Sequence, residues 1–186
     1  MPDAVRRSVF EGCALPRNAR VAVAACTFAQ RFVLRGGADV VGPVARVFDA
    51  APPLLALQSR VSGARAALWM SPDEWLLVDE ACEQELGARL EAALGGVPHA
   101  LIDVSHRHCA LDVSGEEAAR LLNAGVNLDL DVSVFPVGMV VRTLLVKADI
   151  ILWRRAEQSF RLEATRSFGP YVAAILNQAA GDQEMC

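Results

Sequence analysis

The chain has 186 residues, 53% of them hydrophobic, and a mean hydropathy of +0.29, so it can bury a core of its own and still have apolar surface to spare. Its net charge is −4 and no basic run with interleaved aromatic residues occurs, which argues against a nucleic-acid partner. No run approaches the ~20 apolar residues of a membrane span, and no signal peptide is recognised. Five scattered cysteines without a C-x-x-C pair favour free thiols. We therefore expect a soluble, cytoplasmic protein that buries part of its apolar surface against another chain.

The first half of the sequence predicts an arm, four strands and helical segments. Residues 1–20 carry charges without a clear period and are interpreted as the arm. Apolar alternation predicts the strands, at residues 19–26, 30–36, 64–70 and 75–79. A one-turn helix capped by Ser71 is expected between the last two. Leucines spaced four apart predict a longer helix over residues 80–94, ended by Gly95 and Gly96.

The second half opens on LIDVSHRHCALDVSG, residues 101–115, which predicts strand structure. Ser114 and Glu117 form a capping-box pattern that predicts a helix ending at Gly125. A turn-rich link over 127–138 precedes three β-rich runs over 140–165, interpreted as an antiparallel meander with breaks near Lys147 and near residues 156–158. A last helix is expected after Ser167, with a buried stripe at Tyr171, Ile175 and Ala179 and with Val172 and Leu176 beside them.

This order of elements predicts an α+β fold with antiparallel sheets and flanking helices. We expect an N-terminal subdomain over residues 1–97, with the arm, strands and one helix, and a C-terminal subdomain over residues 98–186. The two are expected to pack as one compact unit.

Residues 101–115 gather the groups that most resemble a reactive site. His106 and His108, two apart on a strand, could bind zinc together with Asp112, although a fourth ligand is lacking. Cys109 or Ser105 could act as a nucleophile only if a histidine shared its face, and adjacent strand residues point to opposite faces. The preferred interpretation is structural: Cys109 is a buried, inert thiol. Backbone hydrogen bonds at a strand boundary account for Asp103, Ser105 and His106.

Other patterns are equally unspecific. Neither G-x-G-x-x-G after a strand nor G-x-x-x-x-G-K-[ST] occurs, so no nucleotide site is predicted. Tryptophans in apolar strands could stack on a planar ligand such as a pterin, but they more often belong to a core or an interface: Trp69, Trp75 and Trp153. The acidic excess of residues 80–91 and the basic excess of 142–166 indicate solvated faces or surfaces for chains of complementary charge.

Five segments stand in a distinctive order and spacing: WMSPDEWLLV (69–78), LIDVSHRHCALDVSGEEAARLLNAGVNLDLD (101–131), FPVG (135–138), RTLLVKADIILWR (142–154) and FRLEATRSFGPYV (160–172). Together they resemble the gamma subunits of bacterial heterotetrameric sarcosine oxidases. The central segment is also similar to the folate-binding domain of the aminomethyltransferases, the T-proteins of glycine cleavage. The second resemblance implies a related fold, and does not by itself imply the same chemistry.

In the aminomethyltransferases a hairpin carries a Gly-Gly turn followed by two aspartates, the first acting on the folate-bound one-carbon unit. Aligning residues 156–162 with that family puts Ala148 and Asp149 where the two aspartates stand, and Val146 and Lys147 near the glycines. The resemblance thus implies that a methyl group replaces the first carboxylate, where no general acid or base could then act.

The resemblance implies a non-catalytic gamma subunit that supports assembly of a sarcosine oxidase with alpha, beta and delta subunits. Such an assembly converts sarcosine to glycine and passes a one-carbon unit to tetrahydrofolate, with FAD, FMN, NAD and zinc on the other subunits. We therefore predict no catalytic, cofactor-binding or metal-binding residue in this chain. One alternative is a free-standing folate-binding protein or aminomethyltransferase-like enzyme, for which Asp103, Asp149 and Glu163 are the available carboxylates. A homo-oligomeric interaction module is a second alternative.

Overall fold

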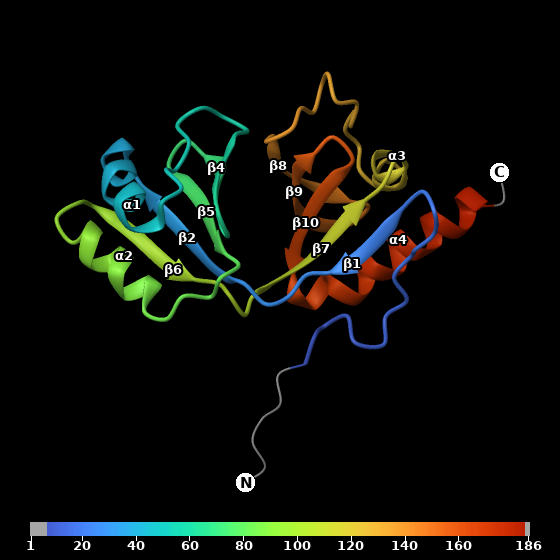
Figure 1. The fold of residues 1–186 in the computed structure, drawn as a ribbon, viewed down its shortest axis with the longest axis horizontal. Helices are drawn as coiled ribbons and strands as arrows, with labels where there is room; N and C mark the ends of the chain where they lie inside the picture. The colour runs from blue at the N-terminus through green and yellow to red at the C-terminus, as the bar shows by residue number, and fades with distance from the viewer. Residues whose placement is uncertain (1–6, 185–186) are drawn as a thin grey trace, which may run out of the picture.

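A computed structural model describes residues 7–184 and shows an α+β fold built on two five-stranded antiparallel sheets (Figure 1). The expected fold class is confirmed. The two sheets stand in separate halves of the molecule, each with its helices on the side away from the other half. Among the described residues no helix is long and apolar enough to cross a membrane.

One sheet, called here the C-terminal sheet, has the strand order β1-β7-β10-β9-β8. Its strands are β1 (Ala22–Ala25), β7 (His108–Ser114), β8 (Val140–Leu145), β9 (Ala148–Ala156) and β10 (Ser159–Thr165). Strands β8, β9 and β10 pair in sequence order, which confirms the predicted meander and its two breaks.

The other sheet, called the N-terminal sheet, has the order β3-β4-β5-β2-β6. Its strands are β2 (Gln30–Gly36), β3 (Ser59–Ser62), β4 (Arg65–Ser71), β5 (Glu74–Asp79) and β6 (His99–Asp103). Every residue of β5 is buried, because this central strand is covered on both faces.

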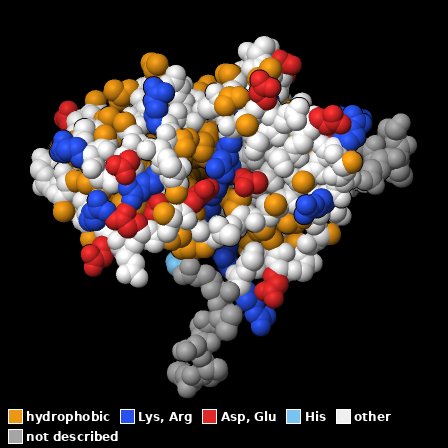
Figure 2. Space-filling model, in the orientation of Figure 1, with side chains coloured by type: hydrophobic (Ala, Val, Ile, Leu, Met, Phe, Trp, Pro, Cys, Tyr) orange, Lys and Arg blue, Asp and Glu red, His pale blue; other side chains and the backbone are white. Residues whose placement is uncertain are grey.

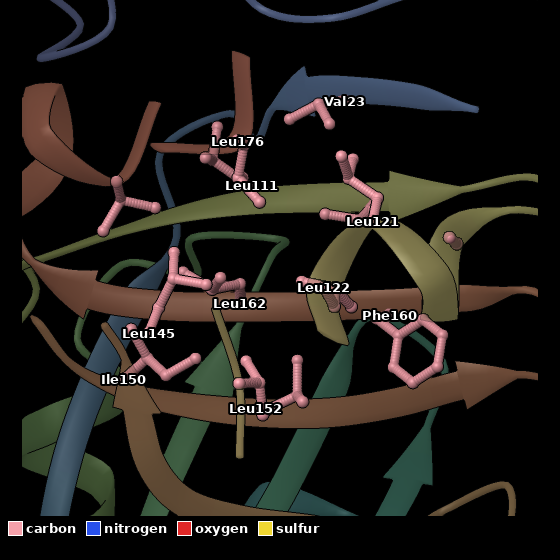
Figure 3. Close-up of a cluster of buried hydrophobic side chains, with 14 of the residues drawn as sticks. Val23, Leu111, Leu121, Leu122, Leu145, Ile150, Leu152, Phe160, Leu162 and Leu176 are labelled. Atoms are coloured by element: carbon pink, nitrogen blue, oxygen red, sulfur yellow. The ribbon is translucent and has the colours of Figure 1, made fainter. Parts of the chain in front are cut away.

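Helices cover the outer face of each sheet and form the two larger cores. The N-terminal sheet carries α1 (Val41–Phe48), preceded by a 3-10 turn over Ala38–Val40, and α2 (Leu86–Leu94), whose three leucines are fully buried as their spacing predicted. The C-terminal sheet carries α3 (Ala118–Asn123) and α4 (Gly169–Glu184), the latter preceded by a 3-10 turn over Arg166–Phe168. Figure 3 shows Leu122 of α3 beside Leu162 and Phe160 of β10, and Leu121 of α3 over β7 near Val23.

A third, smaller core joins the inner faces of the two sheets. It contains aliphatic side chains from β4 and β5 on one side, and Val140, Ile151 and Trp153 from β8 and β9 on the other. This contact fixes the two halves against each other and leaves room beside it for polar side chains.

Residues 101–115 form two strands rather than one. The chain leaves the N-terminal sheet at Asp103, turns over residues 104–107 and enters the C-terminal sheet at His108. A second crossing, over residues 26–29, runs from β1 to β2. Strand β1 pairs with β7, and β6 pairs with β2. By strand pairing, the chain therefore passes from one sheet to the other at these two crossings and not at residue 97. The subdomain division at 97/98 stays a prediction.

Four local predictions were wrong. Ser71 begins a tight hairpin turn between β4 and β5 rather than a helix, and its hydroxyl donates to Asp73 at 2.7 Å. The helix expected from residue 80 begins only at Leu86, since the Asp79 carboxylate accepts hydrogen bonds from the backbone of Ala81 and Glu83 and holds the chain in a turn.

The capping box did not form either, because Ser114 ends β7 and α3 has no side-chain cap. Glu117 instead forms an ion pair with Arg20 at 2.8 Å. Ser167, expected as the cap of the last helix, lies within the 3-10 turn before α4.

Candidate functional site

An open cavity of about 820 Å³ lies between the inner faces of the two sheets. Strands β2 and β6 supply one wall and strands β8, β9 and β10 supply the other, so the lining residues come from both halves of the sequence. Its volume falls within the usual range for small-molecule sites. Figure 2 shows charged side chains gathered where the two halves meet.

Glu74 lies between two arginines of this cavity. Arg35 Nε donates to Glu74 Oε2 at 2.8 Å, and Arg142 donates to the other carboxylate oxygen. Burial by itself raises the pKa of Glu74, but the hydrogen bonds from Arg142 and Arg35 outweigh it and leave the pKa below its ordinary value. Both arginines are more than half exposed, so the trio presents a net positive charge to solvent.

Deeper in the cavity, Glu163 is held between two buried arginines. Its carboxylate accepts from Arg31 Nε at 2.7 Å and from Arg161 Nε at 2.7 Å, and all three side chains are at most 2% exposed. Burial is the largest single effect on Arg161 and opposes its charge, but attraction by Glu163 and the hydrogen bond donated to it, together with smaller contributions such as that of Glu80, outweigh it and raise the pKa of Arg161. Since Arg31 belongs to β2 and Glu163 to β10, this cluster ties the two sheets together.

His108 lies beside this cluster at the start of β7. Burial lowers its pKa, with Arg31, Arg107 and Arg142 adding to the effect while Glu163 opposes it, so the imidazole is neutral at pH 7. Its Nδ1 atom is buried without a hydrogen-bond partner in the described part of the chain.

Asp149 and Glu163 both line the cavity, whereas Asp103 does not. Asp149 is exposed and, within the described residues, is the one lining carboxylate that forms no ion pair. Its neighbour Ala148 is fully buried in the core on the opposite face of β9. The arrangement offers exposed guanidinium groups to an anion, while the buried carboxylate is already occupied by arginines.

The structural interpretation is confirmed for Asp103, Ser105 and Cys109, whereas His106 makes a ring contact in place of the expected backbone hydrogen bond within the described residues. Asp103 accepts from the Ser105 backbone at 2.8 Å, and the Ser105 hydroxyl accepts from the backbone of Arg31 at 2.9 Å. The ring of His106 packs on Phe28. Cys109 is buried, and burial raises the pKa of its thiol to about 11, which leaves it unreactive at neutral pH.

His106 does not share a strand face with His108, because it lies in the turn between the sheets. Within residues 7–181, no group of three or more His, Cys, Asp or Glu side chains is arranged to hold a metal ion. The cysteines at positions 13, 26, 82 and 109 are free thiols, and Cys186 lies outside the described residues.

The tryptophans are part of the cores, in line with the preferred interpretation. Trp75 is fully buried and donates to the Pro53 carbonyl at 2.7 Å, Trp153 lies in the core between the sheets, and Trp69 packs at the edge of the N-terminal core.

Sequence reasoning missed the cavity arginines and Glu74. A signal was nevertheless present, since Arg31 and Arg35 alternate with Phe32 and Leu34 along β2. Charged residues at alternating positions of an otherwise apolar strand predict a polar face whose buried charges require ion-pair or hydrogen-bond partners. Which partners they meet depends on strands that are distant in sequence.

This arrangement of two sheets defines the class of fold. It matches the glycine cleavage system aminomethyltransferase T from Bartonella henselae with a TM-score of 0.66 and 15% identity, over 85% of this chain and 45% of that one. The expected aminomethyltransferase-like fold is thus confirmed. The chain belongs to the sarcosine oxidase gamma subunit family, because the sequence model of that family, described as "SoxG: Sarcosine oxidase, gamma subunit family", matches residues 41–182.

Individual relatives agree with this family. The chain is 36% identical over 117 residues to sarcosine oxidase subunit gamma of Corynebacterium sp. (strain P-1), and 34% identical over 122 residues to that of Corynebacterium sp. (strain U-96). These alignments cover 63% and 66% of this chain, and 57% and 58% of the relatives. A chain of heterotetrameric sarcosine oxidase from Corynebacterium sp. U-96, in complex with pyrrole 2-carboxylate, superposes with a TM-score of 0.86 and 26% identity, over 95% of both chains.

Proposed function

We propose that this chain is a non-catalytic gamma subunit of a heterotetrameric sarcosine oxidase and supports assembly of that complex. The observation that carries the proposal is the match along 95% of both chains to a chain of such a complex. The complex oxidatively demethylates sarcosine to glycine, with one-carbon transfer to tetrahydrofolate. In this proposal the partners are the alpha, beta and delta subunits in the cytoplasm, and FAD, FMN, NAD and zinc are bound by those subunits.

The charges of the cavity support a structural role. Glu163 already accepts from Arg31 and Arg161, so it is poorly suited to exchange a proton with a substrate. The methyl group of Ala148 is buried on the opposite face of its strand from Asp149. A subunit whose buried cavity charges, Arg31, Arg161 and Glu163, are paired with one another serves better to hold a defined shape than to carry out acid–base chemistry.

The test is co-expression of the other subunits with and without this chain. We expect omission to lower the yield of the assembled oxidase, its flavin content and its activity with sarcosine. Full flavin content and normal activity of the remaining subunits would contradict the proposal.

The cavity favours one other candidate, a folate-binding protein. An 820 Å³ space with exposed Arg35 and Arg142 and the unpaired Asp149 suits a ligand that carries both carboxylates and N–H groups. Titration of the isolated chain with tetrahydrofolate tests this candidate, with Arg142→Ala as the cavity variant and Arg60→Ala as a surface control. Submicromolar binding that Arg142→Ala alone abolishes would favour it.

A further inference from the structure

Most of the large hydrophobic side chains exposed on the described residues belong to two loops. Of twelve such side chains, seven lie in the segments 50–58 and 127–139. They form what is called here the loop surface: Leu54, Leu55, Leu57, Leu128, Val132, Val134 and Val137. Leu54, Leu55 and Val134 are each more than half exposed. Single exposed apolar residues are common, but a cluster of them rimmed by polar residues marks an interaction surface.

The two loops are joined to each other, although one belongs to each half of the molecule. The backbone of Val140 donates to Leu57 O at 2.9 Å, and Ser59 donates to Gly138 O through both its backbone, at 3.0 Å, and its hydroxyl, at 2.7 Å. Gln58 and Met139 form an isolated antiparallel bridge. Both loops rise on the same side of the molecule in Figure 1, and hydrophobic side chains lie along that edge on both halves in Figure 2.

Each loop is also anchored to the core beneath it. The indole of Trp75 donates to Pro53 O, which fixes the first loop. The guanidinium of Arg154 donates to Leu130 O, and Phe135 is buried in the C-terminal core, which fix the second. Because the backbone is already ordered, docking on this surface costs little conformational entropy.

The charges of the loops restrict what can cover them. The first loop has no charged residue, and the second has only Asp129 and Asp131. Hydrogen bonds from Ser133 hold the pKa of Asp131 below its ordinary value, so that carboxylate is ionised at neutral pH. A second copy of this chain would bring its own two aspartates to the same surface, and neither loop carries a base to oppose them. Anionic lipid is also a poor match, since the loops contain no Lys, Arg or Trp.

We infer that the loop surface binds another subunit of the oxidase, through an apolar contact area bordered by Lys or Arg side chains that meet Asp129 and Asp131. This inference rests on the proposed function and adds to it the face of the chain that meets a partner. Apolar contacts at the centre and complementary charges at the rim are the usual composition of such interfaces.

The test is co-purification of the whole oxidase through an affinity tag on this chain. The variant Leu55→Asp/Val134→Asp places one new charge on each loop, and because both positions are exposed, its thermal unfolding should match the wild type. We expect the amount of co-purified partner to fall about tenfold or more. The control Ile102→Asp/Val146→Asp changes two similarly exposed residues outside the loops and should retain the wild-type amount.

A second comparison tests the charge at the rim. Asp129→Lys is expected to weaken co-purification, and more strongly at low salt than at high salt, whereas Asp39→Lys, an exposed acid elsewhere, should have no effect. Stronger co-purification of Asp129→Lys would overturn the assignment of a basic partner.

The remaining outcomes separate this inference from the proposed function. If the double variant co-purified as much partner as the wild type, or if the control lost as much, the loop surface would not be the binding face. The proposed function would remain intact. A homodimer of the isolated chain that the double variant dissolves would assign the surface to a second copy. Binding to phosphatidylcholine–phosphatidylglycerol vesicles that the double variant abolishes would assign it to lipid. Failure of the wild-type chain to co-purify would contradict the proposed function itself.

Discussion

Glu163 connects two arginines that reach it from different sheets. Arg31 comes from β2 of the N-terminal sheet, while Arg161 is on β10 with Glu163 itself. Three buried ionised groups would be costly if any were unpaired, and here each hydrogen bond is charge-assisted. The cluster therefore adds little net stability, but it restricts how the two sheets can pack against each other.

Removing that carboxylate should have a large effect on stability. Glu163→Ala leaves two buried guanidinium groups facing each other, and we expect the free energy of unfolding to fall by about 3–5 kcal/mol, measured by urea denaturation. Asp149→Ala, an exposed acid that lines the same cavity and has no ion pair in the described structure, should change it by less than about 0.5 kcal/mol. Similar values for the two variants would mean that the cluster does not hold the sheets together.

At the scale of elements, the turn after β7 depends on a glycine. Gly115 has φ = +118°, and a Cβ atom there would lie 2.2 Å from the carbonyl oxygen of Arg20. That carbonyl belongs to the backbone just before β1, so it cannot move without disturbing the pairing of β1 with β7. Side chains rarely adopt this backbone conformation even where space is free.

Gly115→Ala should therefore lower the free energy of unfolding by about 2 kcal/mol or more, because it combines a backbone clash with an unfavourable φ. Gly37→Ala is the matched control, since its φ is −75° and a Cβ atom added there would have no other atom within 4 Å. Thermal unfolding of both variants by circular dichroism measures the difference. An unchanged melting temperature for Gly115→Ala would show that the turn adapts.

Elements with a strong periodic pattern were predictable. The meander β8–β10 and the leucines of α2 followed from alternation and from four-residue spacing, because both patterns reflect burial of one face. Helix α1 was missed because Gly42 and Pro43 indicate a turn when considered alone. Both lie in its first turn, where proline lacks only a backbone donor that the helix would leave unsatisfied anyway.

At the scale of the whole molecule, the cavity could not be predicted from sequence patterns. Arg35, Glu74 and Arg142 lie on three strands from two sheets, and their meeting depends on how the chain crosses between the sheets. The turn over residues 104–107 that makes this crossing has no strong turn signal. A pattern within one segment reports which face is buried, but not against which distant strand.

Splitting the chain tests the way the sheets are interleaved. Fragments 1–97 and 98–186 each contain one strand that belongs to the other half, so we expect neither to unfold cooperatively alone. The fragment 27–105 contains all five strands of the N-terminal sheet with α1 and α2, and should retain more ordered structure by circular dichroism. A cooperative transition for 98–186 alone would contradict the expectation.

The late pairing of β1 also sets an order of events during synthesis. Strand β1 leaves the ribosome about 90 residues before β7, the strand it pairs with, and at about 5–20 residues per second this interval lasts roughly 4–18 s. The N-terminal sheet is complete once β6 has emerged, whereas the C-terminal sheet must wait for β10 near the end of the chain. The loop surface spans both sheets and is complete only when both have formed. A partner that recognises it therefore binds fully folded subunits in preference to nascent chains.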